Sequence, residues 1–317
     1  MYQIGVDIGG TNIKIGLVND SLEIVEQTSV RFPHDGAEVV ADRLAEAVRG
    51  VLAAAKVSES TLQSIGIVVP GSIDPSGEVV LNAYNLGFCN VPFKKLVETR
   101  FPGVPVFMAN DANGAALAEL YKGAFVGCKT AVLFTLGTGF GGGIILGGKM
   151  FNGGMNHGVE LGHAYLVDGG EPCTCGNHGC IEAYCAASAL AREGARAMQS
   201  DPRGMLAERS GGNAALVDAK LVVDCAKAGD VTALKVFDAY VEHLSSACAS
   251  IFNILDPEVL AIGGGLCAAG EFLFAPLREK LAGKCFYAAH GPVVPAVMGN
   301  DAGIIGAAML RRDTELH

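Results

Sequence analysis

The sequence predicts an α/β protein, because apolar strand-like runs alternate with helical segments along most of its 317 residues. Residues 3–31 predict three strands joined by short turns, and residues 37–56 place Ala, Val and Leu at helical spacing. A second cycle begins at residues 130–148 with a strand, a glycine turn and another strand. The apolar pattern of 6–18 is similar to that of 134–146. We therefore expect a duplicated βββαβα unit that forms two lobes facing each other across a cleft.

The remaining elements follow from shorter signals. Residues 64–71 predict a buried strand that ends on Pro70 and Gly71, and residues 104–111 predict a strand that runs into a helix at 112–123. Further along we expect helices at 182–199, 230–254 and 301–312, a strand and turn at 258–265, and an exposed loop at 201–214. The expected lobes are a small one at 1–118, joined by the C-terminal helix 301–317, and a large one at 119–300.

Composition restricts the partners. The chain has 23 basic and 33 acidic residues, and its formal net charge of −10 argues against nucleic acid or an anionic membrane as a partner. Its ten cysteines are scattered through apolar stretches and no signal peptide is recognised, which favours reduced thiols in the cytoplasm. No apolar run reaches the roughly 20 residues needed to span a bilayer. We expect a soluble, cytoplasmic, globular protein.

Four residues form a candidate metal site: His163, Cys173, Cys175 and Cys180, at spacings of ten, two and five. Thiolate and imidazole together suit zinc, which has no strong geometric demand of its own. Four protein ligands leave no open position for a water nucleophile, so the metal is expected to be structural. The alternative is a set of three buried thiols and a core histidine.

Three glycine-rich turns follow apolar strands, at 7–12, 137–143 and 263–265. Glycine lets backbone amides approach phosphate oxygens, although such turns are also ordinary hairpin chemistry. The run GTGFGG matches a dinucleotide fingerprint literally, but it continues as a strand where that fingerprint must open a helix, so we reject the Rossmann interpretation. Around the first turn, Asp7 could hold magnesium through water, and Thr11 and Lys14 could reach phosphate.

Three acidic residues are candidates for chemistry. Asn110 and Asp111 end a predicted strand and begin a helix, so Asp111 is either an N-cap or a base that accepts a proton from a hydroxyl nucleophile. Glu160 and Glu182 lie on either side of the candidate metal ligands, which could hold both carboxylates in place. Acidic groups that accept hydrogen bonds from hydroxyls are typical of sugar sites.

Together these segments resemble the ROK family (repressors, open reading frames and sugar kinases), and within it the bacterial glucokinases. The resemblance extends over nearly the whole chain. The combination of ELGH with CTCGNHGCIE is highly specific, whereas the glycine turns alone are not. The matching segments are DIGGTNIK at 7–14, NDAN at 110–113, LGTGFGGG at 136–143, ELGH at 160–163, CTCGNHGCIE at 173–182 and AIGGG at 261–265.

The resemblance implies an actin-like, ribonuclease-H-type fold of two lobes, with ATP and sugar meeting in the cleft. It implies that Asp111 is the catalytic base, and that His163 both binds sugar and ligates zinc. It further implies Mg²⁺ with ATP, structural Zn²⁺ and, often, a homodimer. The implied sugar-binding residues are Asn110, Asp111, Glu160, His163 and Glu182. The implied phosphate and magnesium positions are Asp7, Gly9, Gly10, Thr11, Lys14, Thr138 and Gly139, and the adenosine side is Gly264.

The likeness also orders the possible functions. The stretch 85–98 resembles the Asn-Leu-x-Trp/Phe-x-x-Val-Pro segment of glucokinases, which favours D-glucose, phosphorylated at its 6-hydroxyl, over N-acetylmannosamine, N-acetylglucosamine, fructose or allose. Val159 replaces the family's usual Gly, which affects the sugar preference more than the kinase activity. The donor is ATP or polyphosphate. A repressor needs a helix-turn-helix segment, and only six residues precede Asp7, while Asp111 argues against a sugar sensor without turnover.

Overall fold

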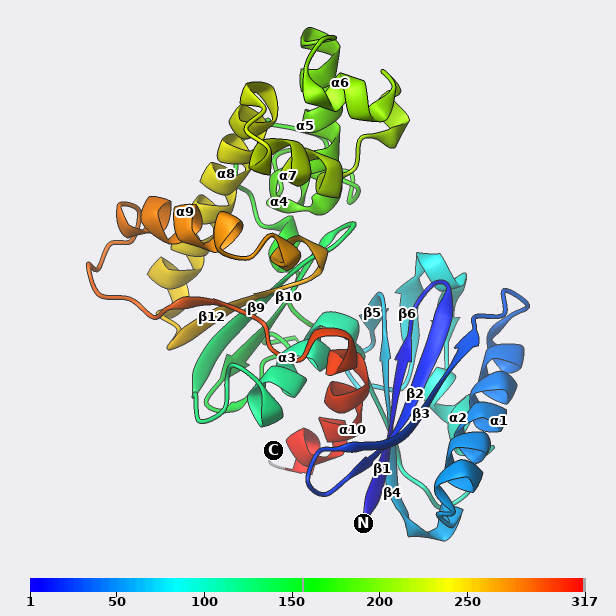
Figure 1. The fold of residues 1–317 in the computed structure, drawn as a ribbon. Helices are drawn as coiled ribbons and strands as arrows, with labels where there is room; N and C mark the ends of the chain where they lie inside the picture. Colours follow the sequence, from blue (N-terminus) through cyan, green and yellow to red (C-terminus); the bar gives the residue numbers. More distant parts are fainter. Residues whose placement is uncertain (156, 316–317) are drawn as a thin grey trace. The chain divides into compact units, whose positions relative to one another are not determined.

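The computed structural model describes residues 1–155 and 157–315, and the chain divides into two compact units (Figure 1). Unit 1 comprises Met1–Lys129, Gly143–Val159 and the chain from Val297 onward, and unit 2 comprises Thr130–Gly142 and Glu160–Ala296. The lobe boundary predicted at residue 118 falls inside helix α3 (Asp111–Lys122), which the units do not divide. The last helix belongs to unit 1, and residues 316–317 of the predicted segment 301–317 lie outside the described residues.

Unit 1 is built on a five-stranded sheet in the order β3-β2-β1-β4-β8. Strands β1 (Tyr2–Ile8), β2 (Asn12–Asn19) and β3 (Ile24–Arg31) are antiparallel neighbours, which confirms the three strands predicted at 3–31. Strands β4 (Leu62–Val69) and β8 (Val106–Asn110) extend the sheet in parallel with β1. Parallel strands end at the same edge of a sheet, so β1 and β8 present Asp7 and Asn110 near their carboxyl ends.

Helices cover this sheet on both faces (Figure 1). The largest apolar cluster of unit 1 joins the sheet to α1 (Ala37–Ala55) and α2 (Phe93–Glu98). The other face packs against α3 and α10 (Ala302–Glu315), which approach very closely because glycines remove side chains from the contacts. A Cβ on Gly5 or Gly66 would collide with the α10 backbone, and one on Gly306 would collide with that of Gly114 in α3. This side of unit 1 therefore tolerates little change in volume.

A three-stranded antiparallel sheet that the sequence did not predict lies in unit 1, in the order β5-β6-β7. Its strands are β5 (Ser72–Ile73), β6 (Val80–Ala83) and β7 (Phe88–Val91), and Figure 1 labels the first two of them. Runs of two to four residues are too short to show a hydrophobic period, which is why the pattern was not recognised.

A second five-stranded sheet has the order β11-β10-β9-β12-β13. The three strands that come first in the chain are followed by two strands that run parallel to β9. The first sheet has the same strand order, which confirms the predicted duplication. The glycine run continues into strand β10 and not into a helix, as expected when the Rossmann interpretation was rejected. The strands are β9 (Thr130–Leu136), β10 (Phe140–Leu146), β11 (Lys149–Met150), β12 (Val259–Gly263) and β13 (Val293–Pro295).

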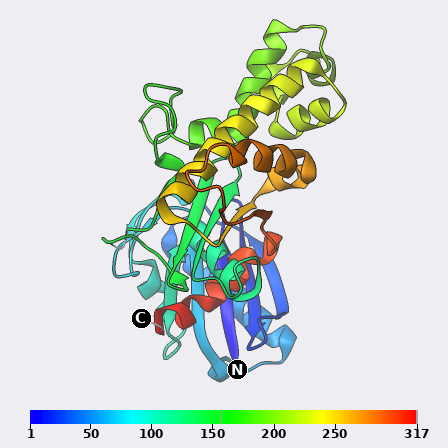
Figure 2. The same cartoon turned by 90° about the vertical axis from the view of Figure 1, so that its left-hand side faces the viewer.

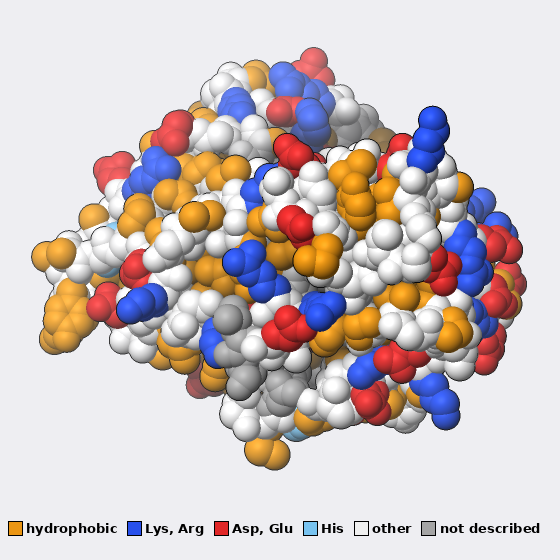
Figure 3. Space-filling view, turned by 90° about the horizontal axis from the view of Figure 1, so that it is seen from below, with side chains coloured by type: hydrophobic (Ala, Val, Ile, Leu, Met, Phe, Trp, Pro, Cys, Tyr) orange, Lys and Arg blue, Asp and Glu red, His pale blue; other side chains and the backbone are white. Residues whose placement is uncertain are grey.

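Unit 2 is completed by helices around a long apolar helix, α8 (Val231–Leu255), against which α5, α7 and α9 pack (Figure 2). These helices are α4 (Glu182–Cys185), α5 (Ala187–Ser200), α6 (Met205–Ser210), α7 (Ala219–Lys227) and α9 (Glu271–Ala282). None of the helices in residues 1–155 and 157–315 is both long and apolar enough to cross a bilayer. Figure 3 shows Lys and Arg side chains interspersed with Asp and Glu on the face seen from below.

Two predictions in unit 2 were wrong. The single helix expected at 182–199 is interrupted at Ala186, whose extended backbone (φ −73°, ψ 159°) ends α4 before α5 begins. The loop expected at 201–214 contains α6, whose Leu206 is buried and whose Ser210 hydroxyl donates to the Leu206 carbonyl oxygen at 2.7 Å. In the sequence, the glycines and the proline on either side of α6 indicate a loop more strongly than its short apolar pattern indicates a helix.

Candidate functional site

The first glycine turn joins β1 to β2 in unit 1. The Gly9 amide donates to the Asn12 carbonyl oxygen at 2.9 Å, which closes the turn, and the Thr11 carbonyl oxygen accepts from the Phe32 amide at 2.8 Å. Gly10 lies beside Asn85, because a Cβ on Gly10 would stand 3.5 Å from the Asn85 Cβ. The side chain of Thr11 is exposed and therefore available to a ligand.

Asp7 is the last residue but one of β1, close to this turn, and faces Lys14 across the β1–β2 ladder. The Lys14 Nζ lies 3.7 Å from the Asp7 Oδ2, and the Asp7 side chain is 23% exposed. Burial raises the pKa of Asp7, and the ammonium group of Lys14 opposes that shift. A Cβ on Gly303 would stand 2.6 Å from the Asp7 Oδ2, so the first turn of α10 lies against this carboxylate. A helix N-terminus favours negative charge, which suits a carboxylate that must stay ionised.

Asn110 and Asp111 occupy the β8–α3 junction, and they divide two roles between them. Asn110 is the N-cap: its Oδ1 accepts from the Ala112 amide at 2.8 Å and the Asn113 amide at 3.4 Å, and its Nδ2 donates to the Gly71 carbonyl oxygen at 3.0 Å. Asp111 is the first helical residue, and it is exposed. The capping role that competed with catalysis in the interpretation of Asp111 therefore belongs to Asn110.

The segment that leads to Glu160 is held to the same helix. The Asn113 Nδ2 donates to the Asn152 Oδ1 at 3.1 Å, and the Asn152 carbonyl oxygen accepts from the Gly158 amide at 2.8 Å. Glu160 itself is exposed and precedes the short 3₁₀ helix Leu161–His163. Sequence reasoning missed Asn113 and Asn152 in this supporting role, because a hydrogen bond between two amides 39 residues apart leaves no spacing signal.

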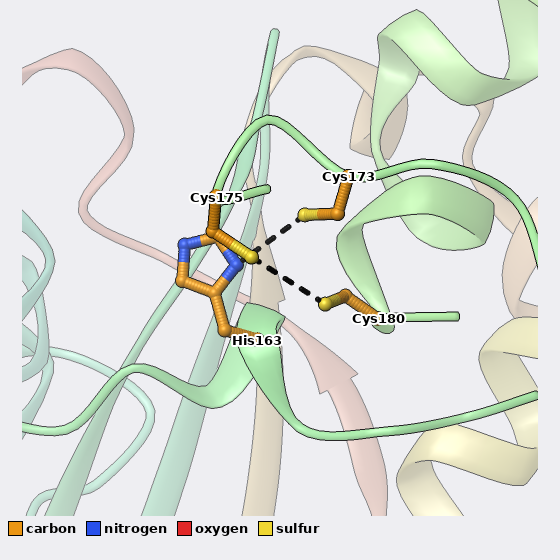
Figure 4. A group of neighbouring side chains, drawn as sticks. All are labelled: His163, Cys173, Cys175 and Cys180. Atoms are coloured by element: carbon orange, nitrogen blue, oxygen red, sulfur yellow. Dashed lines mark hydrogen bonds between the residues drawn. The ribbon is translucent and has the colours of Figure 1, made fainter. Parts of the chain in front are cut away.

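The candidate metal ligands come together in unit 2 as the sequence predicted (Figure 4). One ligand atom from each of His163, Cys173, Cys175 and Cys180 lies within 4.8 Å of the others. The His163 Nδ1 is 3.5 Å from the Cys173 Sγ, and the Cys175 and Cys180 Sγ atoms are 3.7 Å apart. One imidazole and three thiols in this proximity can hold a metal ion.

The thiols of this cluster influence one another's protonation. Burial and the neighbouring thiols raise the pKa of Cys180 to about 12, and burial raises the pKa of Cys173 as well. The pKa of Cys175 is lowered, chiefly because the Asn177 amide donates to its sulfur. Crowded thiols resist simultaneous ionisation, whereas a bound cation deprotonates its thiol ligands. A bound metal would therefore hold Cys173 and Cys180 as thiolates despite their raised pKa values.

Glu182 connects the candidate metal site to the second glycine turn. Its Oε2 accepts from the Phe140 amide at 3.0 Å, and its Oε1 accepts from the Thr174 hydroxyl at 2.6 Å. A Cβ on Gly139 would stand 2.7 Å from the Glu182 Oε2, so glycine is needed for this approach. Thr174 was not among the predicted residues, although it lies between two of the cysteines. The carboxylate thus fixes the glycine turn and the cysteine segment to each other.

The start of α5 holds the same turn from another side. The Ala187 amide donates to the Gly137 carbonyl oxygen at 2.9 Å, and the Ser188 hydroxyl donates to the Thr138 carbonyl oxygen at 2.7 Å. The side chain of Thr138 is exposed. The third turn follows β12, where Gly264 has a φ of +94° and packs so closely on Leu136 that a Cβ would collide with its backbone.

The predicted site residues are therefore divided between the two compact units. Sequence reasoning also missed Gly303. It directly follows Asn300-Asp301-Ala302, which repeats Asn110-Asp111-Ala112 at the start of the corresponding helix of the duplication, and that repeat was a signal that could have drawn attention to this turn. Unit 1 holds Asp7, Gly9, Gly10, Thr11, Lys14, Asn110 and Asp111, and unit 2 holds Thr138, Gly139, Glu160, His163, Glu182, Gly264 and the three cysteines.

Comparison with known proteins gives consistent results. A model of the ROK family matches residues 3–314. A glucokinase of Halalkalibacterium halodurans is 35% identical, with 99% of this chain and 96% of that protein aligned. A glucokinase of Thermotoga maritima is 37% identical, with 98% and 97% aligned. The solved ROK family glucokinase from Streptomyces griseus, in complex with glucose and AMPPNP, is 32% identical over 98% of this chain and 100% of that one, with a TM-score of 0.82.

These alignments extend over both compact units and carry sequence identities above 30%, so they bear on more than the general shape of the backbone. The actin-like sugar kinase fold expected from the sequence is confirmed by the solved structure. On the family match and these identities, the chain belongs to the ROK family.

Proposed function

We propose that this protein is an ATP-dependent glucokinase that transfers the γ-phosphoryl group of ATP to the 6-hydroxyl of D-glucose. The observation that carries the proposal is the β8–α3 junction, where Asn110 takes the N-cap and leaves Asp111 exposed at the first turn of the helix. An exposed carboxylate in the first turn of the helix can be reached by a hydroxyl group of a ligand and can accept its proton. The glucokinases that are 35% and 37% identical to this chain support glucose as the substrate.

In the proposed reaction Asp111 accepts the proton of the sugar 6-hydroxyl as its oxygen attacks the γ-phosphorus. A new O–P bond forms, the bond to the ADP oxygen breaks, and ADP leaves with the electron pair. Amides of the glycine turns around Gly9, Gly10 and Gly139 donate to the phosphoryl oxygens, where negative charge develops. Asp7 would hold, through water, the magnesium ion that binds with ATP, and that ion would neutralise part of this charge.

Four side chains are the proposed sugar contacts. Glu160 and Glu182 accept hydrogen bonds from sugar hydroxyls, whereas Asn110 donates through Nδ2 and His163 donates through Nε2. The one-nitrogen, three-sulfur donor set suits zinc, which would bind His163 through Nδ1, the atom that faces Cys173, and leave Nε2 for the sugar. Thr11, Lys14 and Thr138 are the proposed phosphate contacts, and Gly264 marks the adenosine side.

Gly303 provides a test of the Asp7 role. Replacing Gly303 with Ala places a methyl group 2.6 Å from the Asp7 Oδ2, so the carboxylate must move. Because a displacement of about 1 Å can cost roughly 10²-fold in rate, we expect kcat/KM for MgATP to fall by that order. Steady-state kinetics with varied MgATP measures the effect. Gly50→Ala is the matched control, because nothing lies within 4 Å of its Cβ and its activity should be unchanged. Equal kinetics in the two variants would remove Asp7 from the nucleotide site.

The substrate is tested by coupled ADP release with MgATP across glucose, mannose, fructose, allose, N-acetylglucosamine and N-acetylmannosamine. We expect kcat/KM to be highest for glucose. A preference for an N-acetyl sugar would keep the kinase and replace the substrate. Polyphosphate in place of ATP tests the other donor. Activity on no sugar with either donor would contradict the proposal and favour a sugar-sensing protein.

We also propose a homodimer in the cytoplasm. The observation that supports self-association is the exposure of Val231 and Leu234, one turn apart at the start of α8, since neighbouring exposed apolar side chains suit a protein contact. A mass in solution of one chain, 32.6 kDa, would contradict the dimer.

A further inference from the structure

Glu119 is a buried carboxylate in α3, eight residues after Asp111, that the proposed chemistry does not use. Its side chain is 1% exposed, and both of its oxygens are occupied by backbone amides. The Oε2 accepts from the Ala124 amide at 2.7 Å, and the Oε1 accepts from the amides of Val297 and Met298, both at 2.8 Å. A buried carboxylate satisfied by three amides makes strong, directional contacts, because the charge shortens and strengthens each bond.

The two segments that Glu119 holds are the one by which the chain first leaves unit 1 and the one by which it returns for the last time; two further crossings follow Gly142 and Val159. Ala124 lies on the segment that follows α3 and reaches unit 2 at Thr130, and Val297 is the first residue after the chain returns from unit 2. Gly123 makes the approach possible, because a Cβ there would collide with the Glu119 carboxylate. One side chain therefore ties both segments to the helix that carries Asp111.

The surroundings of Glu119 are rigid. Helix α10 begins five residues after Val297 and packs on α3 through the direct contact of Gly306 with the Gly114 backbone. Helices α3 and α10 therefore form one body. The segments that Glu119 holds lie directly after the end of α3 and shortly before the start of α10.

We propose that Glu119 is a positioning residue that keeps α3, which carries Asp111, and the two segments it holds in the arrangement that the proposed sugar kinase reaction uses. It fixes the point at which the outgoing and returning segments leave α3. Without that fixed point, fewer molecules hold the substrate-competent arrangement, so the apparent affinity for sugar falls by the competent fraction. Water also gains access to the phosphoryl group, and ATP is hydrolysed without transfer to sugar.

Glu119→Gln tests this proposal with minimal change of volume. A glutamine amide has one acceptor oxygen and one NH₂ donor, so it must oppose a donor to at least one backbone N–H group. We expect KM for glucose to rise about tenfold if the competent fraction falls to about a tenth. We also expect ADP release to exceed glucose 6-phosphate formation, whereas the wild type should give a ratio of one. Both products are measured in the same reaction.

Val48→Ala is the matched control for a purely structural effect. Val48 is a fully buried residue of α1 in unit 1, so its truncation lowers the melting temperature without touching the segments that Glu119 holds. A KM and a product ratio in Glu119→Gln that match those of Val48→Ala would overturn the proposal. If Glu119→Gln does not fold, Glu119→Asp takes its place, because it keeps the charge but is too short to hold both segments. A wild type that is inactive on every sugar would refute the proposed function and this role together, whereas an active wild type with an unaffected variant refutes only the role of Glu119.

Discussion

Glucose-dependent ADP release should fall by at least about 10²–10⁴ when Asp111 is replaced by Asn, because the amide cannot accept the hydroxyl proton. The change is nearly isosteric. The Asp111 Oδ1 accepts from the Ala112 amide at 2.8 Å, and an asparagine oxygen can accept the same bond. The N-cap remains with Asn110, so the melting temperature should change little. KM for glucose should also change little, because the hydroxyl can still hydrogen-bond to the side chain.

The measurement is steady-state ADP release together with a thermal melt. Asp35→Asn is the matched control: it is an exposed aspartate in the same unit, and its variant should keep wild-type turnover. Turnover near the wild-type value in Asp111→Asn would reject the carboxylate as the base. Loss of turnover accompanied by a large drop in melting temperature would instead assign Asp111 a structural role.

Removal of the metal should have the largest effect on stability. We expect the purified protein to contain one zinc ion per chain, and Cys175→Ser to lose it. Structural zinc contributes on the order of 10 kcal/mol to folding in small zinc domains, so a chelator or this substitution should lower the free energy of unfolding by several kcal/mol or more. Without the metal, the His163 Nδ1 and Cys173 Sγ, which are 3.5 Å apart, and the Cys175 and Cys180 Sγ atoms, which are 3.7 Å apart, can make only weak hydrogen bonds.

The loss should also reach the proposed sugar contacts. Thr174 lies within the cysteine segment and donates to Glu182, which in turn accepts from the Phe140 amide. Disorder of that segment therefore frees Glu182 as well as His163, and activity should fall together with metal content. Cys89→Ser is the control, since that exposed thiol lies outside the cluster. Elemental analysis that finds no zinc in the active wild type would contradict the assignment.

Much of the fold was predictable because its signals are local. The strands at 3–31 and the helix at 37–56 have clear periods, and the duplication was visible from two similar stretches. The strands of β5-β6-β7 were not predictable, since each is stabilised by its neighbours more than by its own pattern. The same holds for α6, whose six residues are stabilised by burial of Leu206 more than by helical propensity.

The candidate site shows the same division. The sequence by itself determined the metal cluster, because ligand type and spacing constrain a short segment, and it determined that Asp111 is a candidate base. Only the tertiary structure decided that Asn110 and not Asp111 caps α3, that Glu182 joins the cysteine segment to a glycine turn, and that Gly303 and Glu119 serve residues far away in the chain. The physical reason is that spacing records which residues are close along the chain, whereas capping, close approach and buried hydrogen bonds depend on groups that only folding brings together.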